Sequence, residues 1–283
     1  MSVGAAADFS LVYDSAQGVI TRWTAGGRPV LDRGPVLNFW RAPTSNDGKG
    51  IGGRAQAEWR AHGLHDLRPR FGEPRLEQSR TQDPALVVPV RLGGPVIACA
   101  IEAELRYAVD ARGRLSVTIS GHPVGEWTCT WPRVGIELRL PLAYGRCEWY
   151  GLGPGETYAD TCAAGRIGIW RAATEALWTP YVVPQENGSH FGTRAVRFAD
   201  DRGRGLRIVA DRPFCFGVNR YETKDVTEAM HPTDLVARDY YVLSLDIAQD
   251  GIGSASCGPR PSPPFTLNPG PFSFTWVLEP QTH

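Results

Sequence analysis

Short runs in which apolar and polar residues alternate fill most of this chain, and clusters rich in glycine, proline, serine and aspartate separate them. A period of two places successive side chains on opposite faces of a strand, so each run predicts a β-strand. Closely spaced runs between Phe9 and Trp40 predict a meander. Further strands are predicted at residues 85–92, 101–109, 114–120, 134–142, 146–151, 193–199, 206–210, 214–219, 240–248 and 272–278.

Helical signals are confined to two segments. Residues 54–63 have room for two or three turns that end at Gly63, and residues 223–231 begin with Thr223 as a candidate cap and stop before Pro232. The 32 glycines and 23 prolines supply the turns between strands. We therefore predict an all-β fold, a large antiparallel sandwich, with residues 9–283 forming a single domain and residues 1–8 a leader. The abrupt entry into a strand at Phe9 favours a fragment of a longer protein over a natural subunit.

The charge balance argues against several classes of partner. Lysine and arginine total 30, as do aspartate and glutamate, and no long run of one sign occurs. Nothing here attracts nucleic acid or an anionic membrane, and no apolar stretch approaches the ~20 residues that cross a bilayer. The six cysteines lack C-x-x-C or zinc-ligand spacing, which favours free thiols and a cytoplasmic location: Cys99, Cys129, Cys147, Cys162, Cys215 and Cys257.

Three segments, residues 38–53, 149–170 and 179–194, are polar and irregular, and they combine aromatic with hydrogen-bonding side chains. Sugar sites pair an aromatic face with polar groups that satisfy hydroxyls. The aromatic candidates are Trp40, Tyr150, Trp170 and Tyr181, and the polar ones are Asn46, Asp47, Glu156, Glu186 and Asn187. The structural alternative is that the glycines make turns, the aromatics fill the core and the polar groups cap backbone atoms. The glycine-rich stretch after Asp47 predicts a mobile loop, hypothesised to change conformation when substrate binds.

These segments also resemble a known family. NFWRAPTSND resembles the opening of the C-terminal domain of glycoside hydrolase family 2 β-galactosidases, with its R-A-P element followed by N-D. WYGLGPGETYADTCAAGRIGIW is similar to the G-L-G-P-x-E-x-Y-x-D signature of that domain, and TPYVVPQENGSHFGTR to its Y-x-x-P-x-E-N-G element. GIGSASCGP resembles its final loop. The matches occur in the same order as in the family and cover almost the whole chain.

The resemblance implies a β-supersandwich of the galactose-mutarotase-like class. It also implies that the catalytic glutamates of the retaining mechanism, and the Mg and Na ions of the intact enzyme, belong to a preceding TIM barrel. We accordingly expect no catalytic residue, no metal ligand and no cofactor in this chain, and no activity from the chain alone. The expected partners are the barrel and sandwich domains of the same enzyme, in cis or as a large subunit, and a β-galactoside of the lactose type, which implies a role in lactose catabolism.

Within this chain, the resemblance directs attention to the final loop. Some relatives place a tryptophan there as a platform for the sugar, whereas this sequence has Cys257 or Gly258, a smaller surface for stacking. The alternative for Cys257 is an inert thiol in a turn. We take Cys257, Gly258, Asn46 and Asp47 as proximal to substrate. Further residues are assigned to the sugar edge or to structural roles: Arg41, Glu156, Tyr158, Asp160, Glu186, Asn187, His190 and Arg194.

Three rival functions remain open from the sequence. A free-standing sugar epimerase would use His190 with Glu186, Glu156 or Asp160 for proton transfer. An independent retaining glycosidase would need two carboxyl groups about 5–5.5 Å apart. A carbohydrate-binding module would bind galactosides without hydrolysing them.

Overall fold

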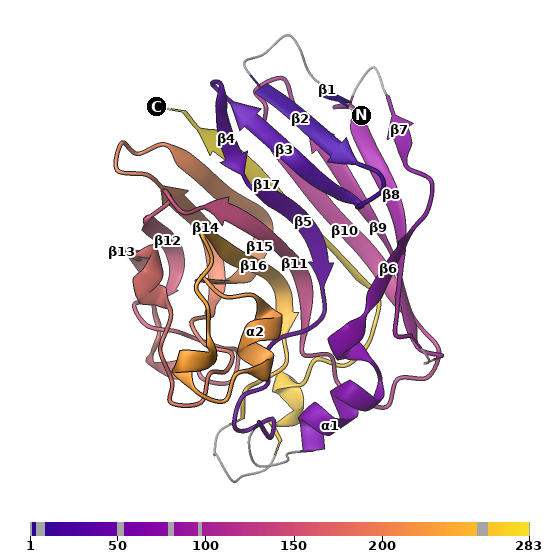
Figure 1. Ribbon diagram of the computed structural model, residues 1–283, viewed down its shortest axis with the longest axis vertical. Helices are drawn as coiled ribbons and strands as arrows, with labels where there is room; N and C mark the ends of the chain where they lie inside the picture. Colours follow the sequence, from indigo (N-terminus) through magenta and orange to yellow (C-terminus); the bar gives the residue numbers. More distant parts are fainter. Residues whose placement is uncertain are drawn as a thin grey trace.

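The computed structural model describes residues 2–3, 9–49, 54–78, 82–95, 98–253 and 260–282. In these ranges the chain is built mainly of antiparallel strands, so the predicted all-β class is confirmed (Figure 1). The helices are α1 (Arg54–Ala61), α2 (Thr223–Glu228) and the 3-10 turns η1 (Leu64–Asp66), η2 (Cys162–Ala164), η3 (Thr174–Leu177), η4 (Pro232–Asp234) and η5 (Pro263–Phe265). No helix within the described ranges is long and apolar enough to cross a membrane.

A small sheet comes first along the chain. It contains β1 (Ser2–Val3), β2 (Phe9–Asp14), β3 (Val19–Ala25) and β4 (Arg28–Leu31) in that order, so Ser2 and Val3, expected in a leader, form a strand that pairs with β2. The remaining strands belong to one large sheet. They are β5 (Arg33–Asn38), β6 (Arg68–Phe71), β7 (Arg75–Glu77), β8 (Ala85–Gly93), β9 (Ala100–Val109), β10 (Leu115–Val124), β11 (Arg133–Pro141), β12 (Arg146–Gly153), β13 (Arg166–Ala173), β14 (His190–Ala199), β15 (Gly205–Asn219), β16 (Tyr240–Gln249) and β17 (Phe272–Gln281).

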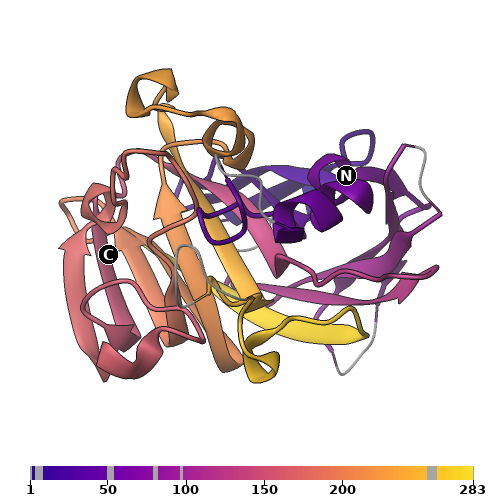
Figure 2. The same ribbon diagram turned by 90° about the horizontal axis from the view of Figure 1, so that it is seen from below.

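The large sheet divides into two layers at β15. Residues 205–210 of this strand pair with β17, and residues 215–219 pair with β16. The rear layer continues through β17, β10, β9 and β8 to β6, and the front layer through β16 and β11 to β5. The two layers face each other as a sandwich (Figures 1 and 2). Because β5 does not pair with β6, the sandwich is not closed by strand pairing at the edge far from β15.

The core lies between these layers, where the alternating pattern turns apolar side chains inward. The rear layer contributes the fully buried side chains of Trp276 on β17 and Ile119 on β10. The front layer contributes those of Ile136 on β11 and Leu245 on β16. The small sheet covers one end, because Tyr13 on β2 packs against Tyr107 on β9 with ring centroids 6.1 Å apart. The apolar side chains of the predicted strands therefore form one continuous hydrophobic core.

Three local expectations need correction. The strands predicted at 206–210 and 214–219 are one strand, β15, which continues through the intervening residues because its two ends pair with different neighbours. The segment 149–170, expected to be irregular, contributes much of β12 and β13, and His190 to Arg194 begin β14. Thr223 is not the cap of α2, since Glu222 precedes the helix and the Thr223 hydroxyl donates to Glu137.

Candidate functional site

Four segments far apart in sequence meet on the outer face of the front layer. They are the loop after β5, the loop between β12 and β13, the loop before β14, and the residues that follow β16. Beneath them, β11 and β16 place charged side chains on the face opposite the core. We call the resulting cluster the polar hub, and it comprises Arg41, Thr44, Asp47, Arg133, Glu186, Asp246 and Asp250.

Arg41 and Asp47 form the first half of the polar hub. The guanidinium of Arg41 is fully buried and donates to both carboxylate oxygens of Asp47, at 2.7 and 3.2 Å. The backbone N–H and the hydroxyl of Thr44 also donate to Asp47, at 2.8 and 2.9 Å. Both carboxylate oxygens of Asp47, which was predicted to lie near substrate, therefore accept hydrogen bonds from residues of its own R-A-P-T-S-N-D loop.

Arg133, at the start of β11, forms the second half. It donates to Glu186 at 2.8 Å and to the hydroxyl of Ser244 at 2.8 Å, and its Nε lies 3.7 Å from Asp246. The polar hub holds two guanidinium groups against four carboxyl groups, so negative charge is in excess. Burial raises the pKa of Asp246 from 3.8 to about 6, with Arg133 opposing the shift, and burial likewise raises the pKa of Asp250.

The base of the final loop, residues 251–253, is held by Arg41 of the polar hub together with Asp160 and Asn46. Asp160 accepts hydrogen bonds from the backbone N–H groups of Ile252 and Gly253, at 3.2 and 2.9 Å. The amide of Asn46 donates to the carbonyl of Ile252 at 2.8 Å, and Arg41 donates to the carbonyl of Gly251 at 3.3 Å. Side chains from the segments 38–53 and 149–170 thus form hydrogen bonds with both backbone N–H groups and backbone carbonyls of residues 251–253.

Asp250 links the same base to helix α1. Its carboxylate accepts from the hydroxyl of Thr130 at 2.7 Å and from the backbone N–H of Leu267 at 2.8 Å. The indole N–H of Trp59, buried in α1, donates to the same Thr130 hydroxyl at 3.1 Å. The position of the final loop is therefore coupled to the packing of α1.

The P-x-E-N-G segment is organised by two further predicted residues. Glu156 accepts from the backbone N–H of Gly188 at 2.6 Å and from the hydroxyl of Tyr181 at 3.0 Å. The side chain of Asn187 accepts from the backbone N–H of Thr179 at 2.8 Å and donates to the carbonyl of Gln185 at 3.0 Å. Gly188 has φ of 72° and lies against the carbonyl of Leu177, so this turn requires glycine.

His190 is a core residue. Its ring is stacked on Phe216, with centroids 4.7 Å apart, and contacts the edge of Trp149 at 4.5 Å. Its Nδ1 lies 3.0 Å from the carbonyl of Gly188, and burial lowers its pKa from 6.5 to about 4. The carboxylates proposed as its partners are already engaged: Glu186 pairs with Arg133, Glu156 accepts from Gly188, and Asp160 accepts from residues 252–253. A buried neutral imidazole without a free carboxylate partner is poorly suited to the proton transfer that an epimerase requires.

The remaining predicted residues are divided between the interior and the surface. Tyr158 is buried beside the polar hub, and its hydroxyl has no hydrogen-bond partner within the described residues. Arg194 lies over the exposed ring of Tyr150, 5.6 Å from its centroid. Trp40 donates to Thr227, and Trp170 donates to the carbonyl of Gly151. Cys257, Gly258 and residues 50–53, part of the loop predicted to be mobile, lie outside the described residues.

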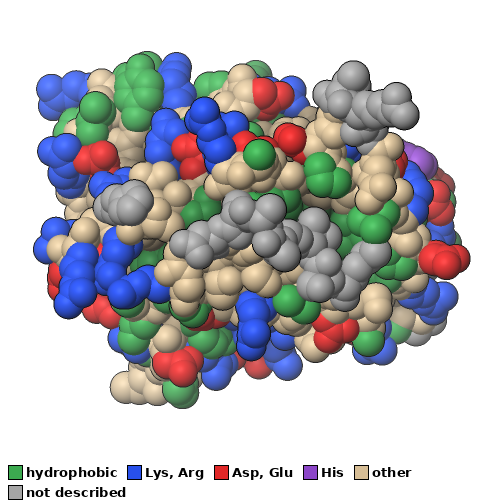
Figure 3. Space-filling model, turned by 90° about the horizontal axis from the view of Figure 1, so that it is seen from above, with side chains coloured by type: hydrophobic (Ala, Val, Ile, Leu, Met, Phe, Trp, Pro, Cys, Tyr) green, Lys and Arg blue, Asp and Glu red, His purple; other side chains and the backbone are tan. Residues whose placement is uncertain are grey.

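Sequence reasoning missed several members of the site. Arg133 and Asp246 lie at buried positions of strands, and Gln185 accepts from the backbone N–H of Ser45 at 2.9 Å. The available signal was a charged residue in a run that is otherwise apolar, as in YYVLSLDIA. No cluster of three or more potential metal-binding side chains occurs among the described residues, and the five cysteines in those ranges are unpaired. Figure 3 shows acidic and basic side chains interspersed over the face seen from above.

Comparison with known proteins identifies relatives along most of the chain. A family model described as beta galactosidase small chain matches residues 5–278. The β-galactosidase of Arthrobacter sp. (strain B7) is 34% identical over 87% of this chain, and that of Actinobacillus pleuropneumoniae is 28% identical over 95% of it. The chain spans about a quarter of these relatives, 26% of each.

Solved structures with related shapes are more distant. A GalM/aldose epimerase homologue from C. elegans is 10% identical with a TM-score of 0.49, covering 99% of this chain and 97% of that protein. A galactose 1-epimerase from Lactobacillus acidophilus NCFM is 10% identical with a TM-score of 0.45, covering 99% of this chain and 93% of that protein. Neither similarity bears on activity.

Proposed function

Because this chain belongs to the β-galactosidase small-chain family, we propose that it forms one wall of the pocket of a β-galactosidase. Cleavage of the β-galactoside is carried out by residues outside the chain. The observation that carries this proposal is the fixed base of the final loop, where Asp160, Asn46 and Arg41 together bind residues 251–253. Gly253 is the last described residue before the stretch that carries Cys257 and Gly258, the two residues predicted from the sequence to be proximal to substrate.

Four carboxylates of the candidate site have structural roles that conflict with catalysis. A retaining glycosidase needs one carboxylate as nucleophile and one as acid and base. Asp47 and Glu186 are paired with Arg41 and Arg133, while Glu156 and Asp160 accept backbone N–H groups. We therefore assign hydrolysis to a barrel domain of glycoside hydrolase family 2 type, which would supply the two glutamates and hold the Mg and Na ions. A cytoplasmic role in lactose catabolism fits this assignment.

The test separates this chain from the rest of its enzyme. The purified chain is assayed with nitrophenyl β-galactoside alone, and then after mixing or co-production with the remaining portion of the same enzyme. We expect no hydrolysis above buffer from the chain alone and full activity from the pair. Enzymatic turnover by the chain alone would overturn the proposal, as would full activity of the remaining portion without it.

Two further measurements exclude the rival functions. Calorimetry of the chain with galactose and lactose should show little heat, because one wall buries too little of a sugar, whereas a binding module would give a clear isotherm. Polarimetry with α-galactose should show no acceleration of mutarotation, since His190 is buried in the core. Acceleration that disappears in a His190→Gln variant would instead support an epimerase.

A further inference from the structure

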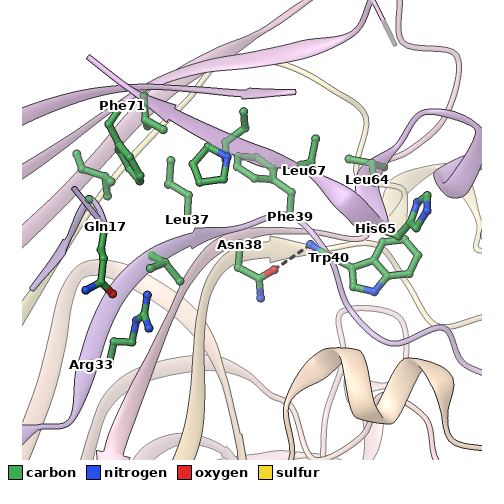
Figure 4. Close-up of a pocket in the computed structure, with 16 residues that line it drawn as sticks. Gln17, Arg33, Leu37, Asn38, Phe39, Trp40, Leu64, His65, Leu67 and Phe71 are labelled. Atoms are coloured by element: carbon green, nitrogen blue, oxygen red, sulfur yellow. Dashed lines mark hydrogen bonds between the residues drawn. The ribbon is translucent and has the colours of Figure 1, made fainter. Parts of the chain in front are cut away.

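A groove opens at the unpaired edge of the sandwich, and none of its lining residues belongs to the polar hub. It has a volume of about 340 Å³ and runs between β5 on the front layer and the segment from η1 to β6 (Figure 4). Its walls also include Val90 and Leu92 of β8 and Leu105 of β9 on the rear layer. The groove therefore lies where the two layers separate without a strand between them.

The floor of this groove is the hydrophobic core itself. Phe39, Leu64, Val90, Leu92 and Leu105 belong to the continuous core cluster and line the groove from below. Leu37, Leu67 and Phe71 are only partly buried at its sides. Apolar surface that continues from a core into an open groove is unfavourable in water, and covering it with another apolar group is favourable.

One end of the groove carries an unpaired positive charge. Arg33 lines this end, and within the described residues its guanidinium makes no ion pair or hydrogen bond. Figure 4 shows Gln17, from the turn between β2 and β3, beside Arg33. No aspartate or glutamate lines the groove, and Trp40 and His65 form the opposite end. The groove thus presents long apolar walls, with the Arg33 guanidinium at one end and the Trp40 and His65 rings at the other.

We propose that this groove is the docking seat for a segment of the remaining part of the enzyme, a segment that inserts a large apolar side chain and places a carboxylate against Arg33. This inference rests on the proposed function. The relatives are about four times as long as the matched region, so about three quarters of such an enzyme is available to pack against this chain. Most of the lining is apolar, and its polar side chains are Gln17, Arg33, Asn38, Trp40 and His65, so an apolar side chain with a carboxylate matches the walls and the charge of Arg33 better than a sugar does.

The experiment measures assembly of this chain with the remaining portion of the same enzyme, produced separately and titrated by light scattering and by recovered hydrolysis. Leu37→Asp removes an apolar wall, and Arg33→Glu reverses the charge at the end of the groove. Buried anchors at interfaces typically carry at least ~2 kcal/mol, so Leu37→Asp should weaken association by ~30-fold or more. Arg33→Glu should weaken it by ~10-fold, with a larger loss at low salt. The matched control is Arg22→Glu, an exposed residue of β3 outside the groove, which should leave association unchanged.

The outcomes separate this inference from the proposed function. If the wild-type chain fails to assemble or to restore hydrolysis, the proposed function fails. If it assembles and both groove variants behave like Arg22→Glu, the groove is not the seat and only this inference fails. Because Leu37→Asp could unfold the chain, Arg33→Glu gives the decisive reading. If the chain alone forms dimers and Arg33→Glu dissociates them, the groove binds a second copy of the chain. If the groove binds octanoate and assembly is unaltered by the bound acid, the groove is a site for a small amphipathic acid. Either result overturns the proposal.

Discussion

The polar hub and the groove both contain arginine next to apolar side chains, but these arginines differ in burial and in their ion-pair partners. Arg41 and Arg133 are buried and donate to carboxylates at 2.7 and 2.8 Å. Arg33 is only partly buried and has no such partner in the described part of the chain. Buried charges are strongly unfavourable unless they are paired, whereas a charge in contact with water is tolerated alone. The hub therefore contributes to the stability of this chain, and the groove contributes to contacts beyond it.

The strongest test of this contrast removes the partner of a hub arginine. Asp47→Ala leaves the fully buried Arg41 with the carbonyl of Gly251 as its one hydrogen-bond acceptor among the described residues, and breaking a buried pair in this way costs about 3–5 kcal/mol. The free energy of unfolding, measured by urea denaturation, should fall by that amount. Asp66→Ala is the control, because its pair with Arg68 is exposed, and it should lower the free energy of unfolding far less than Asp47→Ala does. Equal losses from both variants would contradict the contrast.

The burial of Asp246 in the hub predicts a pH dependence. The pKa of Asp246 is about 6 in the folded protein against 3.8 ordinarily, so the folded state holds its proton more tightly. The free energy of unfolding should therefore fall as the pH rises from about 4 to about 6, by up to about 3 kcal/mol, and this contribution should be constant above that range. Urea unfolding across pH 4–8 should show a shallower decline in Asp246→Asn. Parallel curves for the two proteins would show that Asp246 ionises normally.

A smaller effect is expected where the hub meets the final loop. Asp160→Ala removes the acceptor of two backbone N–H groups, those of Ile252 and Gly253, and should cost about 1–2 kcal/mol. Amide exchange at these two residues should accelerate, and the assembled enzyme should lose activity on galactosides. Asp110→Ala provides a matched control, since Asp110 also accepts two backbone N–H groups, in a turn remote from the loop. Unaltered exchange at residues 252 and 253 would contradict the anchoring role.

The fold was largely predictable because period-two alternation determines which side of a strand is buried. It was less predictable where pairing changes along one strand: the residues between Ala210 and Phe214 look like a turn, yet β15 continues because β17 pairs with one half and β16 with the other. β6 and β7 carried no signal, since their residues are mostly exposed and polar. The local alternation of apolar and polar residues thus predicts where strands lie in the sequence, but it does not predict which strands pair with each other in the sheet.

The candidate site was predictable only in its parts. Asn46, Asp47 and Glu186 were identified from loop composition and Asp160 from the family resemblance, but their partners lie up to 207 residues away, so topology alone brings them together. Sequence reasoning placed Asn46 and Asp47 near substrate, and the contacts show them supporting the loop whose later residues, Cys257 and Gly258, were predicted to contact sugar. The groove had no sequence signature, because its walls come from five separate segments.

The smallest expected effect completes the contrast between the two regions. Arg33→Gln removes a charge that has no partner in the described residues, so the free energy of unfolding of the isolated chain should change by less than ~0.5 kcal/mol. If the groove receives a carboxylate from the rest of the enzyme, the same substitution should weaken assembly severalfold and make it less sensitive to salt. Urea denaturation and association at two salt concentrations measure both quantities on one variant. A loss of stability comparable with that of Asp47→Ala would mean that Arg33 serves the fold, and that groove and hub are alike.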